Sequence, residues 1–224
     1  MTRNRLALPL SLALLAAAPT AFAADDDHSK VNGSIEIAAG ERARDVDTVN
    51  GSIEIGAGAQ VGDAETVNGS IEVADKAQVN DLATVNGDIR VGPGVVVAGD
   101  VETVNGGIFV DRGGDIRGGI ESVNGSIGLV DADVAGGIET VNADLTVGVD
   151  SHVRGGIHYE EIKQSWISFE RRDPRVVIGP NARVDGALVF EREVELYVHE
   201  SARVGPVTGA TAVAYSGARA PKGD

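Results

Sequence analysis

The chain has 224 residues, a formal net charge of −15, no Cys and 30 Gly, and its aromatic residues are one Trp, three Tyr and four Phe. Without Cys the chain can form no disulfide framework, no Cys-ligated metal site and no thiol nucleophile. The acidic balance argues against nucleic acid as a partner, because phosphate binding needs a basic surface. Few aromatic residues beside many Gly predict a core made of thin layers of Val, Ile and Ala.

Residues 1–23 are predicted to be a secretory signal peptide. Arg3 and Arg5 precede an apolar run over residues 6–18, and the Ala-Phe-Ala segment at residues 21–23 matches a cleavage site. The apolar run is too short to span a bilayer, which takes about 20 residues. The mature chain is therefore expected to begin near Ala24, to carry no transmembrane segment and to be periplasmic or secreted.

A short phrase that begins with V-N recurs along most of the chain. It starts at seven positions: Val31, Val49, Val67, Val85, Val104, Val123 and Val141. Successive copies are 18 or 19 residues apart. Helical repeats need more than about 30 residues per unit, so this period excludes them. Three short strands and three corners do fit, and the repeat predicts an all-β fold, a parallel β-helix (β-solenoid) with 18–19 residues per coil.

Apolar residues recur every six residues, as at Val49, Ile55 and Val61, which predicts one buried column on each of three faces. Asn-Gly and Gly-rich segments lie between these columns. They are typical of corners, because Gly and Asn tolerate a positive φ. At the Asn-Gly corner a Thr column runs beside the Val column, and either could face inward, since a one-residue slip exchanges them.

The coil pattern continues at residues 178–184 and 198–204, so about nine coils are expected in a solenoid over residues 24–205. A Gly- and Ala-rich tail follows over residues 206–224. The step from Val153 to Val184 spans 31 residues, which is too long for one coil and predicts an insertion at about residues 158–175. The insertion contains Trp166, which could anchor a partner. We favour the alternative that the insertion folds back and covers the solenoid.

Polar residues are also expected to stack in columns. Asn side chains should hydrogen-bond along the axis, as in cross-β ladders: Asn32, Asn50, Asn68, Asn86, Asn105, Asn124 and Asn142. Two columns are acidic, one of Asp47, Glu65, Glu102, Glu121 and Glu139, and one of Glu36, Glu54 and Glu72 that ends at Arg90. Stacked like charges repel by roughly 1 kcal/mol per pair in water. Divalent cations or a basic partner could relieve this, and a solvated acidic face is the simpler interpretation.

No catalytic, cofactor-binding or metal-binding residue is predicted. The chain has four His residues, of which His152 and His158 could serve as a base or a zinc ligand on the outside of a coil. No second ligand cluster accompanies them in the sequence, and no nucleophile elbow, P-loop or triad order occurs. We therefore expect a protein that is not an enzyme and that uses no cofactor.

Two coils, V-N-G-S-I-E-I-G-A-G-A-Q-V-G-D from residue 49 and V-I-G-P-N-A-R-V-D-G from residue 177, resemble the bactofilins. Bactofilins are polymer-forming cytoskeletal proteins of bacteria that are built on a β-helix. The resemblance covers about residues 31–204 and implies a filament-capable scaffold without catalytic residues or bound nucleotide. The signal peptide and the aromatic insertion depart from that family, whose members are usually cytoplasmic.

The sequence thus favours a non-enzymatic structural or interaction scaffold of the bacterial cell envelope. Self-association is expected through the N-terminal coil, because the residues before Val31 include Asp25, Asp26 and Asp27, which cover an apolar edge poorly. The tail offers a cap for the other end, so a head-to-head dimer is favoured over a long polymer. The alternative is a carbohydrate-binding or carbohydrate-active β-helix, which the scarcity of aromatic residues in the repeats disfavours.

Overall fold

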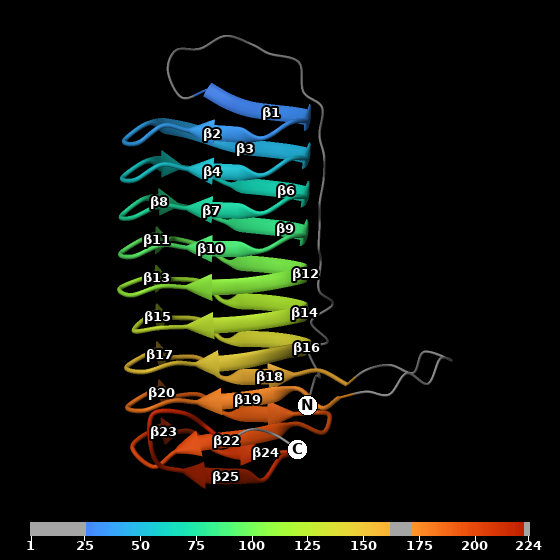
Figure 1. Ribbon diagram of the computed structural model, residues 1–224, viewed down its shortest axis with the longest axis vertical. Helices are drawn as coiled ribbons and strands as arrows, with labels where there is room; N and C mark the ends of the chain where they lie inside the picture. The colour runs from blue at the N-terminus through green and yellow to red at the C-terminus, as the bar shows by residue number, and fades with distance from the viewer. Residues whose placement is uncertain (1–25, 162–171, 222–224) are drawn as a thin grey trace, which may run out of the picture.

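The computed structural model describes residues 26–161 and 172–221, which form a parallel β-solenoid of about ten coils. Within these residues the secondary structure is strand and turn, without a helix. The coils stack along the long axis from β1 at one end to β25 at the other (Figure 1). The predicted all-β solenoid is confirmed, and the expected count of about nine coils is close to the observed one.

Each coil has three faces, and the strands of one face pair in parallel with their equivalents in the next coil. The first face contains β2 (Ile35–Ile37), β4 (Ile53–Ile55), β7 (Ile71–Val73), β10 (Ile89–Val91), β19 (Arg175–Ile178), β22 (Glu195–His199) and β25 (Ala212–Tyr215). The second contains β5 (Gln60–Val61), β8 (Gln78–Val79), β11 (Val96–Val97), β13 (Asp115–Ile116), β15 (Asp133–Val134), β17 (His152–Val153), β20 (Arg183–Val184) and β23 (Arg203–Val204).

The third face contains β1 (Asp26–Asn32), β6 (Ala64–Asn68), β9 (Leu82–Asn86), β18 (Ile157–Tyr159), β21 (Leu188–Phe190) and β24 (Val207–Thr208). Four longer strands bend around a corner and belong to two faces: β3 (Arg42–Asn50), β12 (Val101–Val110), β14 (Ile120–Leu129) and β16 (Ile138–Val147). Equivalent residues are in register, so side chains at equivalent positions of the repeat stack from coil to coil.

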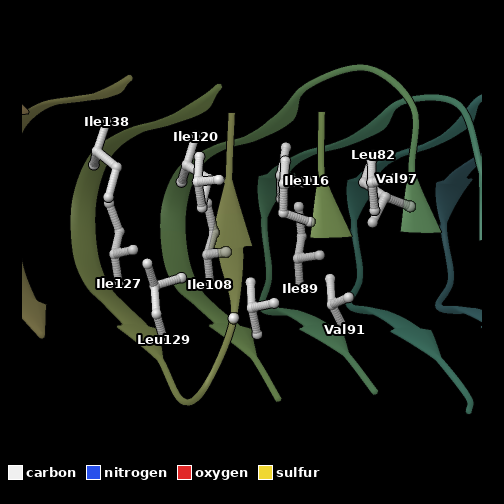
Figure 2. Packing of buried hydrophobic residues seen from close by; sticks show 14 of the residues in the cluster. Leu82, Ile89, Val91, Val97, Ile108, Ile116, Ile120, Ile127, Leu129 and Ile138 are labelled. Atoms are coloured by element: carbon white, nitrogen blue, oxygen red, sulfur yellow. The ribbon is translucent and has the colours of Figure 1, made fainter. Parts of the chain in front are cut away.

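A single apolar core runs along the axis of the solenoid. Ile71 packs in register between Ile53 and Ile89, and all three are fully buried. Figure 2 shows that Ile89 of the first face, Ile116 of the second and Leu82 of the third point into the same interior. Each coil contributes a thin layer of Ile, Val, Leu and Ala, so the stability of a coil depends on the coils above and below it.

The six-residue apolar rule holds on two faces and is wrong on the third. There the Thr column faces inward, with Thr66 and Thr84 each 1% exposed, while Val67 of the neighbouring column is half-buried on the outside. The Thr66 hydroxyl donates to the carbonyl of Gly51 at 2.9 Å. Because that hydrogen bond satisfies the hydroxyl, a Thr can replace an aliphatic residue in the core.

The 31-residue step from Val153 to Val184 joins two neighbouring coils, because these residues pair in register. The chain leaves the solenoid after β18 and re-enters it at β19 (Figure 1). Trp166 and the expected covering of the solenoid by the insertion lie outside the described residues. Solenoid strands also extend past the expected boundary at residue 205, since β24 and β25 continue the stack as far as Tyr215.

Candidate functional surfaces

The Asn ladder follows one corner of the solenoid. In each coil the side-chain Nδ2 donates to Oδ1 of the Asn in the preceding coil, and the six distances lie between 3.0 and 3.4 Å. The ladder ends at Asn142, whose Oδ1 accepts from the Arg192 guanidinium at 2.8 Å. The ladder therefore has a direction, with its amide donors pointing toward the N-terminal end. The predicted ladder is confirmed.

The first acidic column lies on the outside of the third face. Glu102, Glu121 and Glu139 are direct neighbours across paired strands, and His158 is in register with Glu139. Their side chains are half-buried. Asp100 lies beside this column at the adjacent corner, where its Oδ1 accepts from the backbone N–H of Gly119 at 2.6 Å. This surface of the solenoid is therefore strongly acidic over several coils.

Stacking and partial burial make Glu121 hard to ionise. Burial, followed by the charges of Glu102 and Glu139, raises the pKa of Glu121 to about 7. Burial also raises the pKa values of Asp47, Glu65 and Glu102. Like charges held close together on a half-desolvated surface oppose ionisation, so these four carboxylates take up protons at a higher pH than isolated carboxylates do.

This column predicts a stability that changes with pH. A carboxyl whose pKa is raised in the folded state stabilises the fold while it is protonated. That contribution is complete below its ordinary pKa of 4.5 and disappears as the pH rises through about 7. We therefore expect Glu121→Gln to stabilise the protein at pH 8, by about 1 kcal/mol after solvent screening, and to have little effect at pH 5. Thermal unfolding at both pH values measures the difference.

The matched control is Glu54→Gln, in the second acidic column, where Glu54 is exposed and stacks between Glu36 and Glu72. Because Glu54 is exposed, solvent screens its charge, and its substitution should change the stability little at pH 8 and at pH 5. Equal effects of Glu121→Gln at the two pH values would contradict the assignment of a raised pKa to this position.

His152 and His158 belong to separate surface contacts. His152 Nε2 lies 2.8 Å from Asp185 Oδ2, and its Nδ1 lies 3.6 Å from Asp133 Oδ1. His158 faces Glu191 at 3.5 Å. In residues 26–161 and 172–221 no three His, Asp or Glu side chains are grouped in a way that suits a metal ion. No helix in this part of the chain is long and apolar enough to cross a membrane.

At the N-terminal end of the stack, the inward positions of the first strand hold polar and charged residues instead of apolar ones. On the edge strand β1, His28 and Lys30 occupy the positions that are in register with the buried Val46 and Thr48. The Lys30 ammonium folds back and donates to the carbonyl of Ser34 at 2.8 Å, while Val31 is 66% exposed. Polar and charged residues at inward positions of an edge strand discourage unspecific pairing.

The C-terminal end differs in chemistry. Its last strands, β24 and β25, consist of uncharged residues, and Val213 is 51% exposed. Tyr215 closes part of the core, because its ring is buried and its hydroxyl donates to the carbonyl of Ile178 at 3.3 Å. Both ends therefore present a strand edge without a partner strand among the described residues, one charged and one apolar.

The sequence contained a signal for the polar inward positions of β1. Counting back from Asn32 in the repeat register assigns His28 and Lys30 to inward positions, although that segment carries no hydrophobic pattern. Comparison of the chain with protein-family models, curated proteins and solved structures gave no match. The proposals below therefore rest on the geometry of the solenoid.

Proposed function

We propose that this chain is an exported, non-enzymatic scaffold of the cell envelope that associates with itself through its N-terminal coil. The observation that supports this is an unbroken solenoid with an unpaired strand edge at each end of the described residues. A rod with a continuous core and in-register ladders is suited to keep its two ends at a fixed distance and in a fixed orientation. Unpaired edges offer backbone donors and acceptors to a second strand.

The charges of β1 favour pairing with a second copy of the same strand. Two β1 strands related by a twofold axis run antiparallel, as an isologous contact requires. With the axis at His28, the acidic start of β1 in each copy lies opposite the basic end of the other copy, at Lys30. The acidic start and the basic end of β1 are therefore self-complementary, and opposite charges facing across strands stabilise such a pair. The result is a head-to-head dimer.

A charge reversal at the edge tests this proposal. We expect light scattering to report a dimer for the purified chain from residue 24 and a monomer for Lys30→Glu, because β1 then carries acidic residues that repel their copies. Lys76→Glu is the matched control, since Lys76 is an exposed residue at a corner in the middle of the stack, and it should remain dimeric. A third variant, Val213→Lys, changes the opposite end.

The possible outcomes show which end of the solenoid forms the contact between two copies. A dimer that persists in Lys30→Glu and dissociates in Val213→Lys would move the contact to the C-terminal end. A chain that remains monomeric at high concentration would contradict self-association through either end.

A further inference from the structure

The Asn ladder is also a row of chemically labile sites. Six of its seven Asn residues are followed by Gly, and Asn142 is followed by Ala. At an Asn-Gly pair the backbone nitrogen of Gly can attack the side-chain Cγ of Asn. A C–N bond forms, ammonia leaves and a succinimide ring results, which water then opens to Asp or isoaspartate. Gly favours this reaction because no side chain hinders the attacking nitrogen.

Inside the ladder both reacting groups are held in place. Asn68 donates through Nδ2 to Asn50 and accepts at Oδ1 from Asn86, both at 3.0 Å. The attacking nitrogen, that of Gly69, donates to the backbone carbonyl of Asn86 at 3.1 Å. Ring closure at Asn68 must break these hydrogen bonds and turn the backbone away from its extended conformation. The reaction therefore requires the coil to open locally.

Asn32 differs from the other members because it is the N-terminal end of the ladder. Its Oδ1 accepts from Asn50 at 3.1 Å, but no acceptor for its Nδ2, the leaving group, is present among the described residues. Asn32 and Asn68 are both exposed, but Asn32 lies at the end of β1, which pairs with another strand on one side. The attacking nitrogen of Gly33 donates to the backbone carbonyl of Asn50 at 2.8 Å, so Asn32 also reacts by local opening, but that opening disturbs one neighbouring coil, whereas opening at Asn68 disturbs two.

We propose that Asn32 is a site of spontaneous deamidation in the folded protein and that the interior ladder residues are protected. An Asp at this position still offers an oxygen to the Asn50 donor, so the ladder beyond it is kept. The same change at Asn68 removes the donor to Asn50 and sets a carboxylate against an amide oxygen. The product at Asn32 adds one negative charge to the N-terminal end of the rod.

The chain supplies its own matched controls, because Asn32, Asn50, Asn68 and Asn124 all lie in the sequence V-N-G-S. The folded protein is incubated at mildly alkaline pH, at a concentration where light scattering reports the monomer. Peptide mass mapping and isoaspartate labelling then follow each site. We expect Asn32 to convert at least about tenfold faster than Asn68, since terminal segments open more readily than interior ones. In urea the four sites should convert at equal rates.

The melting temperature is a second readout, and it tests the place of each Asn in the ladder independently of its exposure to solvent. Asn32→Asp should melt at the wild-type temperature, whereas Asn68→Asp should melt lower. The proposal is overturned if Asn68 converts as fast as Asn32 in the folded protein, if Asn32 is as slow as Asn68, or if the two Asp variants lose the same stability.

Discussion

Ile71→Asp is expected to unfold the solenoid, whereas Val67→Asp is expected to leave it folded. Ile71 is fully buried between Ile53 and Ile89, where a carboxylate would find no partner. Burying an unpaired charge costs more than about 4 kcal/mol, and the loss should spread to both neighbouring coils, since each coil is supported by its neighbours. Denaturant unfolding followed by circular dichroism measures the loss.

Val67 is the matched control because it lies four residues away and its side chain is on the outer side of the third face, half-buried. An Asp there should cost about 1 kcal/mol, the usual range of strand preferences on a partly exposed face. Equal damage from the two substitutions would mean that the Thr column and the Val column are exchanged.

Gly69→Ala is expected to destabilise the protein by about 3 kcal/mol or more, through overlap of backbone atoms at the Asn-Gly corner. A methyl group at Gly69 would overlap the carbonyl oxygen of Gly51 in the preceding coil. The backbone would have to move, and this would disturb the hydrogen bond from the Thr84 hydroxyl to Gly69 O, which is 3.0 Å long. Thermal unfolding of the purified variant measures the effect.

The comparison is Gly58→Ala at a different corner. Gly58 has a φ of +68°, and no atom lies within 4 Å of a methyl group placed there. Its substitution should therefore cost only the strain of a left-handed conformation, about 1 kcal/mol. A loss at Gly69 no larger than the loss at Gly58 would contradict the close approach of successive corners.

The period of the repeat was sufficient to predict the architecture, because 18 or 19 residues allow one coil with three faces and little else. Periodicity could not decide which of Thr66 and Val67 faces the core, since both are β-branched and suit a strand. The decision depends on the corner carbonyl of Gly51, which accepts from the Thr66 hydroxyl. That carbonyl belongs to the preceding coil, so its position relative to Thr66 is defined only once the coils are stacked.

The chemistry of the surfaces was harder to predict than the fold. Columns of Asn and Glu follow directly from the register, but the raised pKa of Glu121 depends on how deeply the column is buried. The strand β25 was not expected because the tail is rich in Gly and Ala, and its strand is formed by pairing with β22. Pairing with a well-formed neighbour overrides a weak local preference.

The most direct test of the scaffold proposal is electron microscopy of the purified protein. About ten coils at about 4.8 Å each give a single rod close to 48 Å long. The account predicts rods of constant width whose length is twice that value, with a twofold axis at the junction of two N-terminal ends. Single rods alone, at concentrations where light scattering should detect dimers, would contradict it.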